Sequence, residues 1–168
     1  MNLEKLIIIY STGINSHGGK EYLKYILNEY ANKNYCLFLD SRIDPSTIKV
    51  KKYKQYKNNF LLRINIFLKR IIWKIINKNE LEELFLNGIP PLFKINKSNK
   101  ITIMFQNVFL LDPSFHNYLN ILNNIKFLLL RRFINIFLLD SYDVLLQTNT
   151  MKKHFKKLNK KNNTIIVN

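Results

Sequence analysis

The sequence predicts an open α/β sheet, mostly parallel, with helices on both faces. Apolar runs of strand length alternate with longer runs of helical periodicity along the 168-residue chain. Three of the four glycines, Gly13, Gly18 and Gly19, fall in one turn between the first apolar run and the first amphipathic run. Hydrophobic residues make up 47% of the chain, which is enough to fill a sizeable core. The length predicts one domain, spanning residues 1–168.

The first half of the chain predicts a strand–helix–strand unit and then a long helix. Leu6–Tyr10 indicates a buried strand, Lys20–Lys33 has one apolar helical side, and Tyr35–Asp40 indicates a second strand. Because such crossovers are right-handed, the two strands are expected to be parallel. Ile48–Asn59 is polar and basic and predicts a loop or a short strand. Phe60–Lys78 has the strongest helical periodicity in the chain. Its apolar stripe, expected to face the core, comprises Phe60, Ile64, Phe67, Leu68, Ile71, Ile72 and Ile75.

The second half continues the alternation. Leu81–Leu86 fits either a strand or a last helical turn, and the Asn87-Gly88 and Pro90-Pro91 pairs then break the chain. The remaining expected elements are a strand at Lys100–Gln106, a helix N-capped by Ser114 and ending near Phe137, a strand at Asp143–Gln147, a helix capped by Thr148 or Asn149 and ending near Leu158, and a strand beginning at Thr164–Val167.

Gly18 and Gly19 open the first predicted helix, with Lys20 beside them. The first turn of a helix has free N–H groups and the positive end of the helix dipole, and glycine lets the backbone approach a ligand closely. These features favour a phosphate site at Gly18, Gly19 and Lys20. The alternative is that the glycines serve only close packing. Asp40 and Arg42 end the second strand, where open α/β sheets bind ligands, although a local surface pair is the simpler interpretation.

Several other chemistries do not fit. A P-loop needs Gly-Lys-Ser/Thr, but Gly19-Lys20 is followed by Glu21, and the spacing from Gly13 to Gly18 breaks the G-x-G-x-x-G dinucleotide pattern. The three histidines lack metal-site spacing, so no metal is expected. Cys36 is the single cysteine, which excludes disulfides within the chain and favours a reducing compartment. The N-terminus does not fit a signal peptide, and no apolar run approaches the ~20 residues that span a bilayer.

The chain has 27 Lys and Arg against 11 Asp and Glu, a net charge of +16. Compositional drift in a chain rich in Lys, Asn and Ile explains this charge as well as an anionic partner does. One such partner is nucleic acid, bound through the basic and aromatic stretch Lys49–Lys57, although no recognised nucleic-acid motif is present. Another is an anionic membrane, facing Arg70, Trp73 and Lys74 of the Phe60–Lys78 helix. The alternative for this helix is core packing with a solvated basic side.

Five short segments, in this order, carry a resemblance to a known family. They are Gly18-Gly19-Lys20-Glu21, Asp40-Ser41-Arg42, Asn87-Gly88-Ile89-Pro90-Pro91-Leu92, Phe105-Gln106-Asn107 with Leu110-Leu111, and Gln147-Thr148 with Met151-Lys152. Together they resemble the N-terminal domain of the family 4 (group 1) glycosyltransferases of the GT-B fold, of the kind that build bacterial lipopolysaccharide and capsule. In the third segment Asn and Gly are exchanged relative to the family's G-N-x-P-P-L.

The resemblance implies a Rossmann-like domain, one half of a retaining, metal-independent glycosyltransferase without a cofactor, whose donor substrate is a nucleotide-sugar. Gly18, Gly19 and Lys20 would face the donor phosphates. Asn107, Asp40, Arg42 and Thr148 would contact the acceptor, a lipid-linked saccharide. The implied location is cytoplasmic, peripheral on the inner face of the cytoplasmic membrane. The resemblance identifies no catalytic residue.

The resemblance covers only the acceptor-side domain, so the chain is expected to be inactive without a donor domain. Two explanations remain open: a separate partner chain supplies the donor domain, or the chain is a truncated product or remnant. A non-enzymatic basic module that binds nucleic acid or an anionic membrane is the alternative to the glycosyltransferase.

Overall fold

The computed structural model describes residues 6–14, 17–48, 50, 53–56, 60–76, 81–95, 99–158 and 160–166. The chain divides into two compact units. Unit 1 comprises residues 1–87 and 94–101, and unit 2 comprises residues 88–93 and 102–168.

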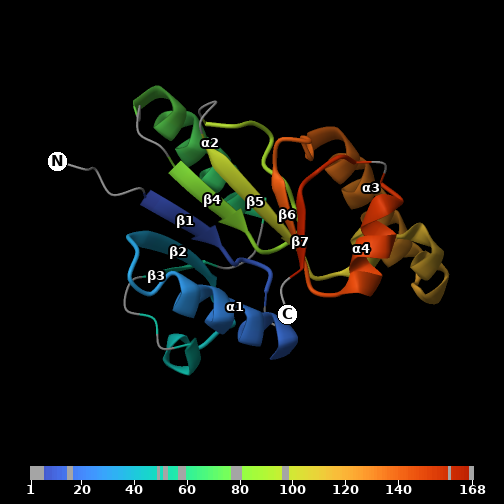
Figure 1. The fold of residues 1–168 in the computed structure, drawn as a ribbon, viewed down its shortest axis with the longest axis horizontal. Helices are drawn as coiled ribbons and strands as arrows, with labels where there is room; N and C mark the ends of the chain where they lie inside the picture. The colour runs from blue at the N-terminus through green and yellow to red at the C-terminus, as the bar shows by residue number, and fades with distance from the viewer. Residues whose placement is uncertain are drawn as a thin grey trace. The chain divides into compact units, whose positions relative to one another are not determined.

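Unit 1 contains four parallel strands in the order β3-β2-β1-β4. The strands are β1 (Leu6–Tyr10), β2 (Tyr35–Asp40), β3 (Tyr53–Tyr56) and β4 (Leu81–Phe85). They run side by side in Figure 1. The helical elements are α1 (His17–Glu29), the 3₁₀ turn η1 (Pro45–Ile48) and α2 (Phe60–Ile76).

Unit 2 contains the parallel strands β6 and β7, with β5 beside β6. The strands are β5 (Lys100–Phe105), whose first two residues belong to unit 1, β6 (Asp143–Leu146) and β7 (Thr164–Ile166). The helical elements are η2 (Val108–Leu110), η3 (Pro113–Tyr118), α3 (Ile121–Phe137) and α4 (Asn149–Lys156).

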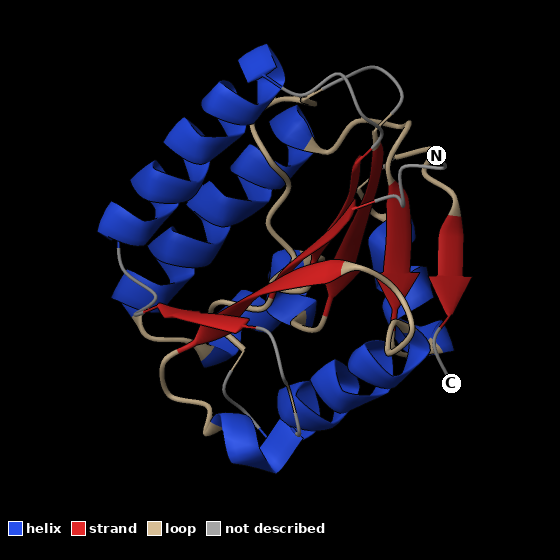
Figure 2. Cartoon of the chain, turned by 90° about the vertical axis from the view of Figure 1, so that its left-hand side faces the viewer, coloured by secondary structure: helices blue, strands red, loops and turns tan. Residues whose placement is uncertain are grey.

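The hydrogen-bonded strand order is β3-β2-β1-β4-β5-β6-β7, and helices flank the strands (Figure 2). The predicted fold class, a Rossmann-like parallel α/β sheet, is therefore confirmed. Strand β1 is a continuous apolar run because both of its faces are covered. Ile7, Ile8 and Ile9 of β1 are at most 2% exposed, and the described residues of β5 from Ile101 onward are buried in the same way.

The sequence located the strands well. Leu81–Phe85, which periodicity left open between strand and helix, is strand β4, and the basic stretch before α2 contains the short strand β3. Lys49, Lys51, Lys52 and Lys57 of that stretch lie outside the described residues. The residues Asn77 and Lys78, expected at the end of α2, and Val167, expected in β7, lie outside them too.

Two helix boundaries differ from the prediction. Helix α1 begins at His17 and ends at Glu29, so Gly18 and Gly19 lie within its first turn. Ser114 does not cap a long helix. It lies in the short 3₁₀ element η3, and α3 begins only at Ile121, where Asn120 is the N-cap and its side chain accepts from Asn123 N–H. Pro113 allows either a 3₁₀ or an α turn after it, so the sequence could not separate the two elements.

The expected orientation of α2 is wrong. Arg70 was placed on a solvated or membrane-facing side, but its side chain is 3% exposed and pairs with Glu83 of β4. Leu68, Ile72 and Ile75, expected to face the core, are exposed. Trp73 is half-buried, and the Lys74 side chain lies outside the described part of the chain. Helical periodicity groups the residues that share a side of the helix, but it cannot show that Arg70 has a buried partner on the following strand.

Candidate functional site

The turn after β1 is the first component of the candidate site. Ser11 and Thr12 are buried, and Gly13 follows with a φ of 93°, a conformation that favours glycine. The Ser11 hydroxyl donates to the carbonyl of Phe38 on β2 at 3.0 Å, and the Ile14 N–H donates back to the Ser11 carbonyl at 3.2 Å. The glycine that needs a positive φ in this turn is therefore Gly13, before the helix, rather than Gly18 or Gly19 within it.

Asp40, the last residue of β2, holds this turn in place. Its carboxylate is fully buried and accepts from the Gly13 N–H at 2.7 Å. It also accepts from the backbone N–H of Arg42 at 3.0 Å and from the Arg42 guanidinium at 2.8 and 2.9 Å. Burial raises the pKa of Asp40, but the hydrogen bonds from Arg42 and Gly13 outweigh it, so the pKa lies below its usual value.

These contacts limit what Asp40 can offer to a ligand. Its two oxygens are occupied by four donors, so its main role within unit 1 is to fix the turn after β1. Arg42, by contrast, has a side chain that is 52% exposed while its guanidinium is oriented by Asp40. The sequence left open whether Asp40 and Arg42 form a surface ion pair or a ligand site. The ion pair does form, and it leaves the Arg42 side chain accessible to a ligand. Contact of Arg42 with an acceptor stays a prediction.

The start of α1 is the second component. The helix has no acidic residue in its first turn, so no carboxylate of that turn competes with an anionic ligand for the helix dipole. Gly18 is exposed, and a Cβ added to it would meet no atom of the described residues within 4 Å. Gly19 is buried and Lys20 is half-exposed. Gly18 therefore leaves open space beside the helix N-terminus, as the predicted phosphate site requires, and the phosphate contact itself stays a prediction.

Asn87 links a third strand end to the same turn. It follows β4, and its amide donates to the Thr12 carbonyl at 3.4 Å. The strand ends after β1, β2 and β4 are thus joined by hydrogen bonds through Gly13, Asp40 and Asn87. This grouping lies at the carboxyl edge of the sheet, where open α/β folds bind ligands. The sequence had placed Asn87 in a chain break and in the third resemblance segment, without a predicted role at the site.

In unit 2, Asn107 and Thr148 lie at neighbouring strand ends. Phe105 of β5 is paired with Leu146 of β6, and each predicted acceptor residue comes two positions later. Both side chains serve as caps. Asn107 accepts from the Phe109 N–H at 2.9 Å, and Thr148 accepts from the Met151 N–H at 3.1 Å. Thr148 is thereby confirmed as the cap of α4, whereas an acceptor contact of either residue is untested.

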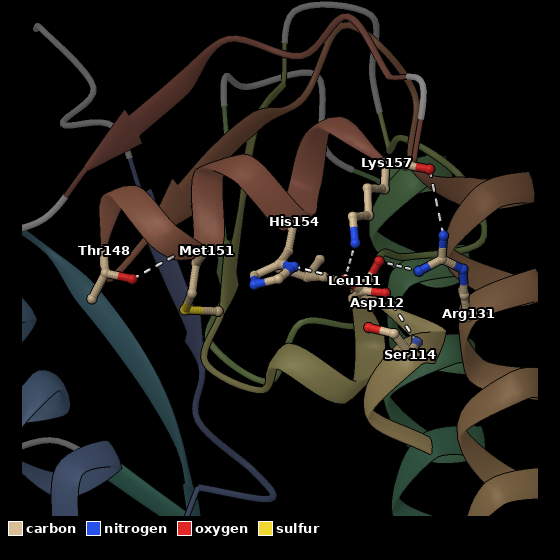
Figure 3. A network of polar contacts seen from close by, with 8 residues as sticks. All are labelled: Leu111, Asp112, Ser114, Arg131, Thr148, Met151, His154 and Lys157. Carbon is tan, nitrogen blue, oxygen red and sulfur yellow. Dashed lines mark hydrogen bonds and ion pairs between the residues drawn. The ribbon is translucent and has the colours of Figure 1, made fainter. Parts of the chain in front are cut away.

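A polar network in unit 2 was not predicted. The buried Asp112 accepts from the Ser114 N–H at 3.0 Å, lies 2.7 Å from His154 Nδ1 and pairs with the Lys157 ammonium. Figure 3 shows the side chains of His154, on α4, and Lys157, just after it, pointing toward Asp112. Burial raises the pKa of Asp112, but the bonds from Lys157, Ser114 and His154 together lower it well below its usual range.

Arg131 extends this network to α3. Its guanidinium donates to the Leu111 carbonyl, next to Asp112, and to the Lys157 carbonyl at 3.4 Å. The network therefore ties η3, α3 and α4 together. The 42 positions between Asp112 and His154 explain why no local pattern indicated it. Among the described residues, no group of three His, Cys, Asp or Glu side chains could hold a metal ion.

The comparisons with known proteins add little to this geometry. No protein family matches the sequence, and no curated protein matches it significantly. Among solved structures, the chain is similar to a short-chain dehydrogenases/reductase (ethylated) from Veillonella parvula DSM 2008, with 14% identity and a TM-score of 0.44, over 87% of this chain and 70% of that one. This likeness is too low to carry an argument about function. Among the described residues, no helix is long and apolar enough to cross a membrane.

Proposed function

We propose that the chain is the acceptor-side half of a glycosyltransferase that transfers a sugar from a nucleotide-sugar to a saccharide acceptor in cell-surface polysaccharide synthesis. The proposal combines the ordered sequence segments with the turn at the carboxyl edge of β1. The observation that carries it is the open space at Gly18, in the first turn of an α1 that has no acidic residue there. A diphosphate fits such a position because it accepts several hydrogen bonds and is favoured by the helix dipole.

The residues around this position have distinct roles in the proposal. Gly18 and Gly19 let the donor phosphates approach the helix, and Lys20 adds positive charge. Asp40 fixes the position of the Gly13 turn, because its carboxylate accepts a hydrogen bond from the Gly13 N–H at 2.7 Å. Arg42 presents a half-exposed guanidinium, oriented by Asp40, to an anionic group.

Charge develops on the nucleotide when the bond to the sugar breaks. The dipole of α1 and the positive charge of Lys20 would stabilise that charge on the leaving diphosphate. The remaining donor contacts belong to the second domain that the resemblance implies, whether in a longer chain or a partner chain. The proposed transfer is therefore assigned to the complete protein, and donor-phosphate binding to this part of it.

Titration of the purified chain with UDP, GDP and ADP tests the phosphate site, with binding followed by calorimetry and by ligand-observed NMR. One of the three is expected to bind, and Gly18→Asp is expected to weaken it by about tenfold, because a carboxylate then fills the open space beside the helix N-terminus. Asn28→Asp is the matched control, since it makes the same charge change at an exposed position near the other end of α1.

Equal affinities of the Gly18→Asp and wild-type chains would reject the phosphate site. To separate a transferase from a general nucleotide-binding protein, the same titration is repeated with the corresponding nucleotide-sugars. Saturation transfer from the protein to the transferable sugar is expected only if the nucleotide-sugar binds as a donor. If the nucleotide-sugar shows saturation transfer to its nucleotide part alone, the transferase proposal fails.

A non-enzymatic module for nucleic acid is the second candidate. The observation in its favour is the set of lysines on and just after α4, of which Lys153, Lys156 and Lys157 are exposed. Lys157 is already paired with Asp112, which reduces the charge this set can offer. Titration with single- and double-stranded nucleic acid at two salt concentrations tests it, since phosphate contacts give a steep salt dependence.

A further inference from the structure

Helix α3 of unit 2 has a continuous apolar stripe on its exposed side. The residues Leu122, Ile125, Leu129 and Ile136 recur at helical spacing, and Leu122, Leu129 and Ile136 are 79%, 65% and 60% exposed. Ile121, Leu128 and Leu139, the last of them just beyond the helix, widen it. We call these seven residues the α3 stripe. Isolated exposed leucines are ordinary, but an apolar patch of this extent marks an interaction surface.

The stripe is not the side by which α3 packs on its own unit. Ile134 and the C-cap Leu138 are fully buried, and the Phe127 ring lies against Phe109 with centroids 5.4 Å apart. Arg131 also points inward and donates to the Leu111 carbonyl. By the 3.6-residue repeat, these residues lie away from the stripe. The helix is therefore anchored on one side while its more apolar side remains exposed.

The charges on α3 indicate what covers the stripe. The helix contains no acidic residue, and Arg132 lies within the stripe while the exposed Lys126 lies at its margin. The nearest acidic residues in the sequence are Asp112, which is buried and paired, and Asp140, beyond the helix end. A partner must therefore accept apolar side chains and also supply negative charge to Arg132.

A second copy of the chain does not meet both requirements. Two α3 stripes facing each other would bring Arg132 and Lys126 against a helix without acidic residues, between chains that each carry a net charge of +16. Nucleic acid supplies negative charge but gains nothing from exposed leucines and isoleucines. An anionic phospholipid surface accepts both, since a helix lying in the headgroup region buries its apolar side while its arginines contact the phosphates.

We propose that α3 docks on an anionic membrane, lying in the plane of the headgroups with the α3 stripe turned toward the lipid. This assignment replaces α2, whose predicted membrane residue Arg70 is buried. It does not depend on the proposed sugar transfer. A protein could bind nucleotide without binding lipid, or bind lipid without binding nucleotide, so the two proposals can fail separately.

Co-sedimentation of the full chain with vesicles tests the proposal. Vesicles of phosphatidylglycerol mixed with phosphatidylcholine are compared with vesicles of phosphatidylcholine alone. The chain is expected to bind the anionic vesicles, and the Ile125→Asp/Leu129→Asp variant is expected to lose about tenfold or more in partition coefficient. Arg132→Glu should reduce binding to the anionic vesicles, because it reverses the charge within the stripe.

Two control variants distinguish loss of the α3 stripe from the general effect of adding a negative charge to the protein. Asn123→Asp adds a negative charge to the exposed first turn of the same helix, away from the stripe, and should keep partitioning within about twofold of wild type. Ile72→Asp adds a negative charge to the exposed apolar side of α2 and should change vesicle partitioning just as little. Circular dichroism and thermal melting establish that each variant is folded.

A direct readout places the stripe in the lipid. In the background of Trp73→Phe, which removes the single tryptophan, Leu128→Trp should show a blue-shifted emission on anionic vesicles and quenching by brominated lipids. The proposal is overturned if the wild-type chain does not bind anionic vesicles, if Ile72→Asp abolishes binding and the α3 variants do not, or if sedimentation shows a dimer that Leu129→Asp dissociates.

Discussion

The guanidinium of Arg70 on α2 pairs with the carboxylate of Glu83 on β4 inside unit 1, where the two side chains are 3% and 0% exposed. The Tyr10 hydroxyl donates to the same Glu83 oxygen at 3.2 Å. The other oxygen, Glu83 Oε2, is buried and has no hydrogen-bond partner among the described residues. Buried charges of this kind are costly to separate, because removing one partner leaves the other uncompensated away from water.

Replacing one partner of this pair is expected to destabilise the protein strongly. Glu83→Leu or Arg70→Met alone should lower the free energy of unfolding by about 3–5 kcal/mol, because each leaves a buried charge without the oppositely charged group that pairs with it. The double variant Arg70→Met/Glu83→Leu should recover most of that loss, since it removes both charges. Urea unfolding of the single and double variants measures this as a double-mutant cycle.

The exposed pair between Lys24 and Glu21 is the control for this cycle. Its atoms lie 2.9 Å apart, but both side chains are exposed to solvent, so Lys24→Ala should cost less than about 1 kcal/mol. Single variants of Arg70 and Glu83 that cost no more than Lys24→Ala would mean that the buried pair does not form.

The contrast between β1 and α2 explains how far the sequence could predict the fold. Leu6–Tyr10 is apolar throughout, and a strand buried on both faces needs nothing more to be recognised. Helix α2 is also apolar, yet Leu68 and Ile72 turned out exposed and Arg70 buried. The partner that holds Arg70 is Glu83 on the following strand, and helical periodicity contains no information about that pairing.

The candidate site also has features that the sequence predicted and contacts that it did not. The glycine-rich turn after β1 was visible in the sequence, and Asp40 was expected beside a strand end. That Gly13 carries the positive φ depends on a hydrogen bond to Asp40, 27 positions later. The Asp112–His154 contact spans 42 positions. Contacts of this range follow from the tertiary packing, and no local spacing predicts them.

Stability is expected to fall in acid because of Asp40 and Asp112. Hydrogen bonds hold the pKa values of both groups in the folded protein below the usual 3.8. The unfolded state therefore takes up protons first as the pH falls, so the stabilisation is complete above about pH 5 and decreases below about pH 4. Chemical unfolding between neutral pH and pH 3 measures the decrease.

Asp112→Asn is the control for this pH dependence. The variant should be less stable than wild type at neutral pH, because Asn cannot pair with the Lys157 ammonium as a carboxylate does. Its unfolding free energy should also change less than that of wild type over the acid range. Parallel pH profiles of the two proteins would show that Asp112 has the same pKa folded and unfolded.

Gly88 and Gly18 should respond in opposite ways to substitution by alanine. Gly88 has a φ of 72°, and a Cβ there would lie 3.1 Å from side-chain atoms of Leu110 and Phe105. Gly88→Ala should therefore cost about 1–2 kcal/mol. Gly18 lies in α1, and no atom in the described part of the chain lies within 4 Å of the added Cβ, so Gly18→Ala should be neutral or stabilise by up to about 1 kcal/mol. Thermal melting of the two variants compares them, and a Gly88→Ala variant as stable as Gly18→Ala would contradict the turn geometry.

The two basic side chains that contact Asp112, His154 on α4 and Lys157 just after it, should differ in importance because they differ in burial. The His154 side chain is 18% exposed, contacts Asp112 at 2.7 Å and packs edge-on against Phe115, whereas the Lys157 side chain is 53% exposed. His154→Phe keeps an aromatic ring beside Phe115 but leaves Asp112 without its imidazole partner, and should lower the free energy of unfolding by about 1–3 kcal/mol. Lys157→Met should cost less than about 1 kcal/mol, since solvent screens its charge. Urea unfolding ranks the variants, and a larger loss for Lys157→Met than for His154→Phe would show that the exposed ammonium, rather than the half-buried imidazole, holds α4 to η3.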